Sequence, residues 1–195
     1  MAGNSSEKIQ YDGVHHLALV SKDMARTVDF YTNVMDMKLV KGFDLGFDMG
    51  QHFFFDMGGG NLLAFFWFSG AAQAAPGVAS AQGLVRDGES IMSAHGSMNH
   101  VAFKAPLDKI EGYRDALIAK GVDCTDMVNH ADVETKPGEA RHSDEPDDTT
   151  WVRSFYFFDP DGIMLEFCAD VTVGSDDIAT PVNAQGLKVE KAASA

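Results

Sequence analysis

The order of predicted elements repeats along this chain, and the repeat limits the folds that it can adopt. A short apolar stretch that begins His-Leu-Ala-Leu at His16 returns as His-Val-Ala-Phe at His100, 84 residues later. Each stretch leads into a helical pattern and then into three further strand patterns, so the order β-α-β-β-β occurs twice. An internal repeat of this size usually means that two modules complete one core. We therefore predict an α+β fold built from paired βαβββ modules.

In the first module a helix follows the first strand directly. Asp23 is a predicted N-cap. The apolar residues after it recur at spacings of 4, 3 and 4 residues, as on one face of a helix: Met24, Val28, Tyr31 and Met35. Gly58-Gly59-Gly60 predicts a hairpin turn between the last two strands. The four strands are expected at residues 14–20, 38–43, 51–57 and 61–68.

The second module follows the same plan. Pro106 suits the first position of a helix, and Gly121 suits its end. Between them runs an apolar stripe of Leu107, Ile110, Tyr113 and Leu117. The four strands are expected at residues 98–104, 122–128, 151–158 and 163–168.

Three segments lie outside the repeated strands and helices: a loop at 69–95, an acidic loop at 129–150 and the tail at 171–195. Loops as long as the first two are commonly lids or binding loops, or are disordered. The tail has little apolar content and is expected to be a mobile end or an arm onto a partner subunit. The predicted organisation is an N-terminal extension at 1–12, the first module at 13–68, a loop at 69–95, the second module at 96–170 with an acidic loop at 129–150, and a C-terminal tail at 171–195.

The net charge of the chain argues against two classes of binding partner. The sequence has 15 Lys and Arg against 29 Asp and Glu, a formal net charge of −14. Such a surface repels nucleic-acid phosphates and anionic membranes, so we expect a small-molecule partner instead. The two cysteines, Cys124 and Cys168, are too few for a disulfide scaffold. Since no stretch approaches the ~20 apolar residues of a membrane span or the core of a signal peptide, we expect a cytoplasmic protein.

Strand alternation places three side chains with metal-binding chemistry on one surface. His16, His100 and Glu166 all project opposite the residues expected to be covered by helices. A carboxylate on an apolar strand face is costly unless it is paired or bound to a metal. Two imidazoles and a carboxylate form the facial triad of non-haem iron sites, and they also hold manganese, zinc, nickel or cobalt. The alternative is that backbone hydrogen bonds or salt bridges satisfy each residue separately.

Several motifs resemble the vicinal oxygen chelate superfamily, which includes glyoxalase I, fosfomycin-resistance transferases, methylmalonyl-CoA epimerases and extradiol dioxygenases. The resemblance covers residues 13–169 without the two long loops. It rests on His-Leu-Ala-Leu-Val-Ser-Lys-Asp at residues 16–23, on Phe30-Tyr31, and on Ser-Phe-Tyr-Phe-Phe-Asp-Pro-Asp-Gly-Ile-Met-Leu-Glu at residues 154–166. It implies that the paired modules form a curved mixed sheet, a half-barrel, around a metal site. It also implies a homodimer, and because some family members contribute metal ligands across the dimer interface, the ligands come either from one chain or from two.

The resemblance places the metal ligands at His16, His100 and Glu166. Glyoxalase I and related lyases use a fourth ligand, a Glu, where this chain has Ala64. That difference argues against glyoxalase I and favours the members with three ligands, which are extradiol dioxygenases and fosfomycin transferases. Both often carry a tyrosine ten residues before the glutamate, and Tyr156 stands there, either as a partner of a substrate oxygen or as a core tyrosine with its hydroxyl at the edge.

Two departures from the family bear on the reaction. Fosfomycin transferases carry an Arg shortly after the ligand Glu, whereas no Arg or Lys occurs here between Glu166 and Lys188. Extradiol dioxygenases place an acid–base His where this chain has Val85. The histidines left for that role are His95, which is nearest to His100, and His130 and His142 in the acidic loop. The remaining neighbour of the site, His15, is expected on the opposite face and in a structural role.

The aromatic residues of the first module suggest the substrate. Two runs, Phe53-Phe54-Phe55 and Phe65-Phe66-Trp67-Phe68, lie on neighbouring strands, and half of these side chains face the core. The others, with Leu62 and Met164, are expected to line an apolar pocket beside the metal. Such a pocket favours an aromatic or hydrophobic substrate and disfavours a phosphonate or another anion.

These expectations combine into one leading function and two alternatives. The leading function is an Fe(II)-dependent extradiol-type dioxygenase, an oxidoreductase acting on a catechol-like substrate, with Tyr156 and His95 as catalytic residues. The first alternative is a glyoxalase-like lyase or isomerase that uses a divalent metal as a Lewis acid. The second is a non-enzymatic drug-binding resistance protein with an acidic cleft.

Overall fold

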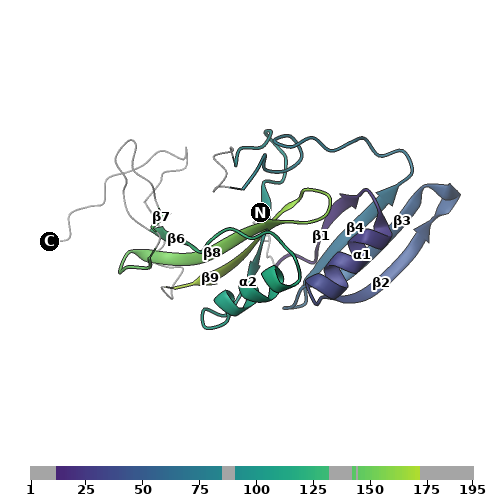
Figure 1. Ribbon diagram of the computed structural model, residues 1–195. Helices are drawn as coiled ribbons and strands as arrows, with labels where there is room; N and C mark the ends of the chain where they lie inside the picture. Colours follow the sequence, from purple (N-terminus) through teal and green to yellow (C-terminus); the bar gives the residue numbers. More distant parts are fainter. Residues whose placement is uncertain (1–11, 85–90, 132–141, 144, 172–195) are drawn as a thin grey trace, which may run out of the picture. The chain divides into compact units, whose positions relative to one another are not determined.

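Each half of the sequence repeat forms a β-sheet of its own. The computed structural model describes residues 12–84, 91–131, 142–143 and 145–171. The chain divides into two units at Gln73 and Ala74, and Figure 1 shows a sheet and a covering helix in each.

The first unit contains a four-stranded sheet in the order β1-β4-β3-β2. Strands β1 and β4 run parallel, and the other neighbours are antiparallel. The elements are β1 (His16–Ser21), α1 (Met24–Asp29), a π-helical turn (Phe30–Val34), β2 (Lys38–Leu45), a 3-10 turn (Gly46–Asp48), β3 (Gly50–Asp56) and β4 (Leu62–Phe68).

Helix α1 covers one face of this sheet. The Asp23 side chain accepts a hydrogen bond from the backbone N–H of Arg26 at 3.2 Å, so the predicted N-cap is confirmed. Tyr31, just beyond α1, is fully buried and lies with its ring 5.5 Å from that of Phe55 and 4.8 Å from that of Phe65. The aromatic residues of β3 and β4 that face this way are therefore core residues, as alternation predicts for half of them.

The second unit repeats this arrangement and extends it by one short strand. Its sheet has the order β5-β9-β8-β6-β7, with β5 and β9 parallel and the other neighbours antiparallel. The elements are β5 (His100–Lys104), α2 (Ile110–Ala119), β6 (Val128–Ala131), β7 (His142–Ser143), β8 (Thr150–Phe158) and β9 (Met164–Asp170).

An aromatic cluster joins α2 to its sheet. Phe167 on β9 lies with its ring 5.7 Å from that of Phe103, 5.6 Å from that of Phe155 and 5.5 Å from that of Tyr113 on α2. Since these residues occupy the helix-covered face, the alternating residues of β5, β8 and β9 project from the other face. The two βαβββ modules and their mixed sheets confirm the predicted fold.

The strand predicted at residues 122–128 is wrong for most of its length. Strand β6 begins at Val128, and before it Cys124 makes only an isolated bridge to Phe157. The Thr125 hydroxyl accepts the N–H of Tyr156 at 3.0 Å and donates to the carbonyl of Asp126 at 2.9 Å. Side-chain bonds of this kind compete with a regular ladder. Helix α2 also begins later than Pro106, because the N–H of Lys109 first closes a turn onto the Pro106 carbonyl.

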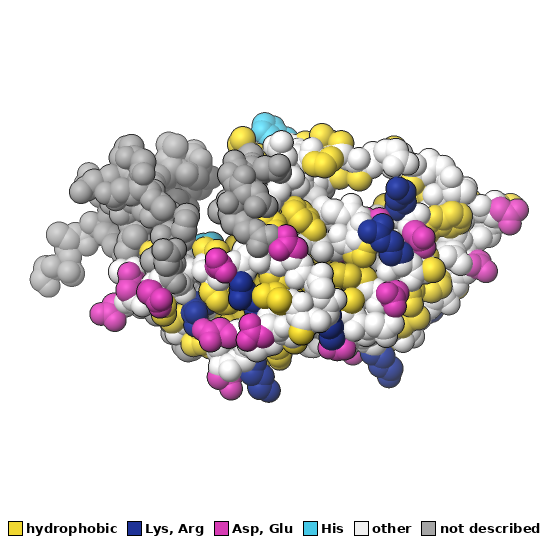
Figure 2. All heavy atoms as spheres, viewed as in Figure 1, with side chains coloured by type: hydrophobic (Ala, Val, Ile, Leu, Met, Phe, Trp, Pro, Cys, Tyr) yellow, Lys and Arg dark blue, Asp and Glu magenta, His cyan; other side chains and the backbone are white. Residues whose placement is uncertain are grey.

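Charged side chains of both signs lie together on the surface of the second unit. Lys104 pairs with Asp170, Arg114 with Asp126, and Arg153 with Glu111. In the view of Figure 2, carboxylates lie among lysine and arginine side chains. Among the described residues, no helix is long and apolar enough to cross a membrane.

Gly50 at the start of β3 provides a test of this fold. Its φ is +145°, and an added Cβ would lie 1.7 Å from the carbonyl oxygen of Trp67. We expect Gly50→Ala to lower the free energy of unfolding by more than about 2 kcal/mol, because both backbone conformation and contact oppose it. Gly46→Ala in the same hairpin is the control, since nothing lies within 4 Å of its added Cβ. Urea unfolding of both variants measures the difference, and equal midpoints would contradict the described hairpin.

Candidate metal and proton-transfer site

A buried carboxylate and an exposed histidine are in contact on the open face of the second sheet. His100 is the first residue of β5, and Glu166 lies on the neighbouring strand β9. The two atoms His100 Nε2 and Glu166 Oε2 are 3.0 Å apart, and Glu166 is only 5% exposed. Because neighbouring residues of both strands face the aromatic core, alternation forces these two side chains onto the same surface.

Three more polar side chains continue this pair along the face. Tyr156 is the cross-strand partner of Glu166, with its ring 6.0 Å from that of His100. Its hydroxyl lies 3.2 Å from Nε2 of His130 on β6. Ser154 Oγ lies 2.9 Å from the same His130 atom and donates to the Tyr156 hydroxyl at 3.4 Å. We call His100, His130, Ser154, Tyr156 and Glu166 the polar cluster.

The polar cluster holds Glu166 charged and Tyr156 protonated. Burial opposes the charge of Glu166, but hydrogen bonds from His100, Ser154 and Tyr156 outweigh it and lower the pKa of the carboxyl group. Burial and the charge of Glu166 raise the pKa of the Tyr156 hydroxyl. Burial, together with the charge of Glu166, also raises the pKa of the nearby Cys168 thiol to about 11. The site therefore offers imidazole nitrogen, a carboxylate and a phenol, with its thiol neutral.

Apolar residues border the polar cluster. Ala81 and Leu84, from the chain between the two predicted modules, are buried against Tyr156 and Met164. The hydroxyl of Ser80 holds this segment by accepting the N–H of Met164 at 3.0 Å. Part of the loop predicted at residues 69–95 therefore covers the open face of β8 and β9.

In the first unit, His16 occupies the place that His100 has in the second. His16 begins β1 and shares an exposed face with Ala18, whereas Leu17 is half-buried. Its cross-strand partner is Leu62, and its ring lies 5.8 Å from that of Phe54. His16 therefore projects onto an aromatic face of the first sheet.

The registers of the two sheets identify the positions that correspond between the units. Ala18, two residues after His16, pairs with Ala64, and Ala102, two residues after His100, pairs with Glu166. Ala64 therefore takes the place of Glu166 in the first unit. By the same comparison Phe54, the cross-strand partner of Ala64, takes the place of Tyr156. The first unit offers one ligand residue at these positions and the second offers two.

The sequence reasoning missed a buried histidine on the aromatic face of the first unit. His52 is 7% exposed and stacks on Phe66, with ring centroids 3.5 Å apart, while Phe54 lies 4.2 Å away. Its Nδ1 is 3.1 Å from the carbonyl oxygen of Phe65, so this nitrogen carries the proton. The sequence contained the information to find it, because His52 lies two residues before Phe54 and therefore projects from the same face of the strand.

The other histidines considered for the site fall in different places. His15 was expected to point away from His16, but their Nδ1 atoms are 2.9 Å apart, so that expectation is wrong. Alternation does not govern His15, because β1 begins only at His16. His95 lies in an exposed turn. The side chain of His142 and position 85 lie outside the described residues.

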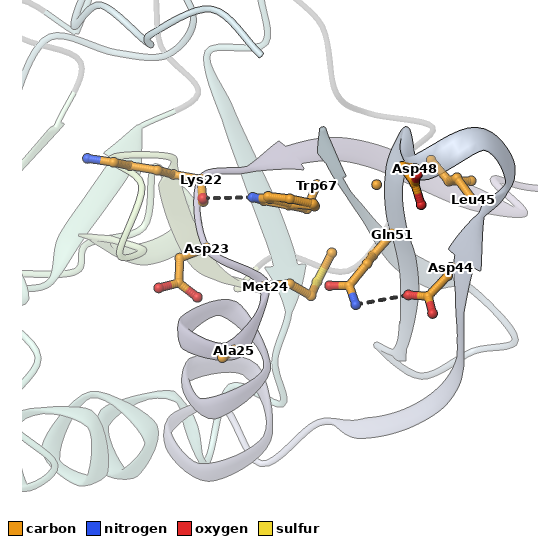
Figure 3. Close-up of a pocket in the computed structure, with 10 residues that line it drawn as sticks. Lys22, Asp23, Met24, Ala25, Asp44, Leu45, Asp48, Gln51 and Trp67 are labelled. Carbon is orange, nitrogen blue, oxygen red and sulfur yellow. Dashed lines mark hydrogen bonds between the residues drawn. The ribbon is translucent and has the colours of Figure 1, made fainter. Parts of the chain in front are cut away.

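A pocket of about 770 Å³ in the first unit lies on the helix-covered face, away from His16. Figure 3 shows Trp67, Gln51 and Met24 around it. The Trp67 indole donates to the carbonyl of Lys22 at 3.1 Å, and the Gln51 amide donates to Asp44 at 3.0 Å. Gln51 and Trp67 pair in register with Ser21, so they project from the same face of the sheet as Ser21. His16 projects from the opposite face, so the pocket and His16 lie on opposite sides of the sheet.

The donor pair in the second unit fits a metal ion. An imidazole nitrogen and a carboxylate oxygen are both metal-ligand atoms, and His100 Nε2 and Glu166 Oε2 lie 3.0 Å apart, within the range of a hydrogen bond. Within the part of the chain that the structure describes, no three His, Cys, Asp or Glu side chains form a group that could hold a metal. The set of His16, His100 and Glu166 joins two units and stays a prediction.

Comparison with known proteins identifies the family. The model of the Glyoxalase/Bleomycin resistance protein/Dioxygenase superfamily matches residues 13–167, which confirms the resemblance in the motifs. No protein of curated function matches the chain in sequence.

Solved structures share the fold at low sequence identity. The crystal structure of SMU.1112c is 23% identical, with a TM-score of 0.56, and covers 82% of this chain and 99% of its own. A glyoxalase family protein from Enterococcus faecalis is 19% identical, with a TM-score of 0.55 and coverage of 81% and 98%. The fosfomycin resistance protein FosX from Listeria monocytogenes is 17% identical, with a TM-score of 0.51 and coverage of 83% and 96%.

The lowered pKa of Glu166 predicts how stability depends on pH. A carboxyl group whose pKa is lower in the folded state stabilises that state above its ordinary value of 4.5, and the contribution is lost as the pH falls through the folded-state value. We expect the metal-free wild type to lose more stability than Glu166→Gln between about pH 6 and about pH 3.

Thermal unfolding across this pH range measures the effect. Glu111→Gln, which changes an exposed glutamate on α2, is the matched control and should follow the wild type. Parallel curves for the wild type and Glu166→Gln would show that the pair with His100 does not hold the carboxylate charged.

Proposed function

The chain belongs to the Glyoxalase/Bleomycin resistance protein/Dioxygenase superfamily, and we propose that it is a metal-dependent enzyme with His16, His100 and Glu166 as ligands. The reaction we propose is extradiol-type cleavage of a catechol-like substrate by O₂, with Fe(II) as the metal. The observation that carries the proposal is the Tyr156–His130 hydrogen bond beside the His100–Glu166 pair. A metal ligand pair next to a proton-transfer pair suits catalysis better than simple binding.

The donor set supports a metal with open positions. Two nitrogens and one carboxylate are the ligands of non-haem iron enzymes, and Ala64 offers no fourth side-chain ligand. When bound, such a metal would hold two neighbouring substrate oxygens as a Lewis acid and, if it is iron, supply the chemistry with O₂. Both oxygen atoms of O₂ would enter the product.

The polar cluster supplies proton transfer. The Tyr156 hydroxyl stays protonated because burial and Glu166 raise its pKa, so it can donate a hydrogen bond to a substrate oxygen. His130 Nε2 lies within reach of both Tyr156 and Ser154, so it can accept a substrate proton relayed through these hydroxyl groups and return it, while both hydroxyl groups stay protonated. We therefore assign the acid–base role to His130 rather than to His95, which lies in an exposed turn.

The aromatic face of the first unit supports the substrate class. Phe54 and Phe66 lie on the same face as His16, and Phe43 continues this face onto β2. Planar aromatic rings stack favourably on such side chains. The net charge of −14 further disfavours an anionic substrate.

Metal analysis of protein purified anaerobically without added metal tests the ligand set. We expect about one ion per chain in the wild type and about a tenth or less in His100→Ala and Glu166→Ala, since each change removes one of three ligands. His95→Ala is the control and should keep the metal. Full metal content in both ligand variants would overturn the proposed site.

Oxygen uptake with a panel of catechols tests the reaction. Iron together with uptake supports a dioxygenase. Bound zinc, nickel, cobalt or manganese without uptake would favour the alternative of a lyase or isomerase. Ligand binding that survives His100→Ala without any metal would favour a drug-binding protein.

Paired variants test the acid–base assignment. We expect His130→Gln to lower kcat by about 100-fold or more while the metal content stays unchanged, because the variant cannot accept a proton. His95→Gln should leave kcat within about twofold. The reverse pattern would assign the acid–base role to His95.

A further inference from the structure

The residue before each proposed ligand histidine contacts the Nδ1 atom of that histidine. Asn99 Oδ1 lies 2.8 Å from His100 Nδ1 in the second unit. His15 Nδ1 lies 2.9 Å from His16 Nδ1 in the first. Within a strand, the side chain of the preceding residue points to the opposite face. His15 and Asn99 lie just before the first residues of β1 and β5, so their side chains can point toward the histidine that follows.

The contacts of Asn99 fix the orientation of its amide. Its Nδ2 donates to the carbonyl oxygen of Ile91 at 2.5 Å and to Ser93 Oγ at 3.2 Å. A carbonyl oxygen only accepts, so the nitrogen of the amide must face Ile91 and the oxygen must face His100. Since Asn99 Oδ1 also only accepts, His100 Nδ1 must carry a proton.

The backbone of Asn99 is held as well. Its carbonyl oxygen accepts from the N–H of Ala81 and from the hydroxyl of Ser80, both at 3.3 Å. The residue is therefore anchored to two separate segments of the loop between the modules, one at Ser80-Ala81 and one at Ile91 to Ser93.

Both nitrogens of the His100 ring face an acceptor, the charged Glu166 carboxylate at Nε2 and the Asn99 amide oxygen at Nδ1. Asn99 Oδ1 lies at Nδ1, and Glu166 Oε2 lies 3.0 Å from Nε2. A proton on Nε2 would occupy the lone pair that a metal needs, whereas a proton on Nδ1 leaves Nε2 free. When a metal replaces the proton on Nε2, Asn99 holds the remaining proton on Nδ1, so Nε2 is the nitrogen available beside Glu166.

We propose that Asn99 is a positioning residue that accepts the Nδ1 proton of His100, so that Nε2 is presented to a metal beside Glu166. This inference rests on the proposed metal site. Asn99 is not itself a ligand.

The tautomer can be measured in the metal-free full-length chain by two-bond ¹H–¹⁵N NMR at about pH 8.5, above the ordinary pKa of imidazole. The His100 ring is assigned by its absence in His100→Gln. We expect Nδ1 to be protonated in the wild type and to lose its proton in Asn99→Leu, where Glu166 at Nε2 is the remaining acceptor. Asn99→Asp loses the donor to Ile91 and Ser93 but keeps an acceptor at Nδ1, so Nδ1 should stay protonated as in the wild type. Asn33→Leu, at an exposed asparagine of the first unit, is the matched control.

Zn²⁺ affinity, measured by calorimetry on the same proteins, links the tautomer to the site. We expect Asn99→Leu to bind Zn²⁺ about 10- to 100-fold more weakly than the wild type. Asn99→Asp and Asn33→Leu should bind within about threefold of it. An unprotonated Nδ1 in the wild type, or equal tautomers in the wild type and Asn99→Leu, would overturn the inference.

The two readouts separate the inference from the function on which it rests. If the wild type binds no Zn²⁺ but its tautomer follows Asn99, the proposed metal site fails while the control of His100 by Asn99 stands. If Zn²⁺ binds with equal affinity in all variants, the site stands and Asn99 does not position its ligand.

Discussion

The burial of one carboxylate on an apolar strand is the constraint on which the candidate site depends. Glu166 is 5% exposed between Leu165 and Phe167, and a charge so placed is stable only when several groups satisfy it. His100, Ser154 and Tyr156 do so, and they keep its pKa low despite burial. The arrangement that stabilises the charge also places a metal-binding atom, His100 Nε2, directly beside it.

Comparison of the two units distinguishes the features that form the sheet from the side chains that could bind a metal or transfer a proton. Both units keep a strand, a covering helix and three further strands with the same pairing order. At corresponding positions, however, Ala64 stands in place of Glu166 and Phe54 in place of Tyr156. The second unit thus holds the carboxylate and the proton-transfer groups, and the first holds His16 and an aromatic face.

Much of the fold could be predicted from the sequence, because it follows from local patterns. Alternation placed His100, Tyr156 and Glu166 on one face, and the Asp23 cap marked the start of α1 correctly. Features set by side-chain hydrogen bonds could not be predicted. The hydrogen bonds of the Thr125 hydroxyl leave only an isolated bridge where a strand was predicted. The side chain of His15, just before β1, contacts His16. His130 contacts the Tyr156 hydroxyl, 26 residues away in the sequence.

X-ray absorption spectroscopy of the metal in anaerobically purified protein tests the proposed ligand set. We predict a first shell of only nitrogen and oxygen, with scattering from two imidazole rings in the wild type. We predict scattering from one ring in His16→Gln, because this change removes one of the two proposed imidazole ligands. An unchanged imidazole signal in His16→Gln, or a sulfur neighbour from Cys168, would contradict the proposed set of His16, His100 and Glu166 as ligands.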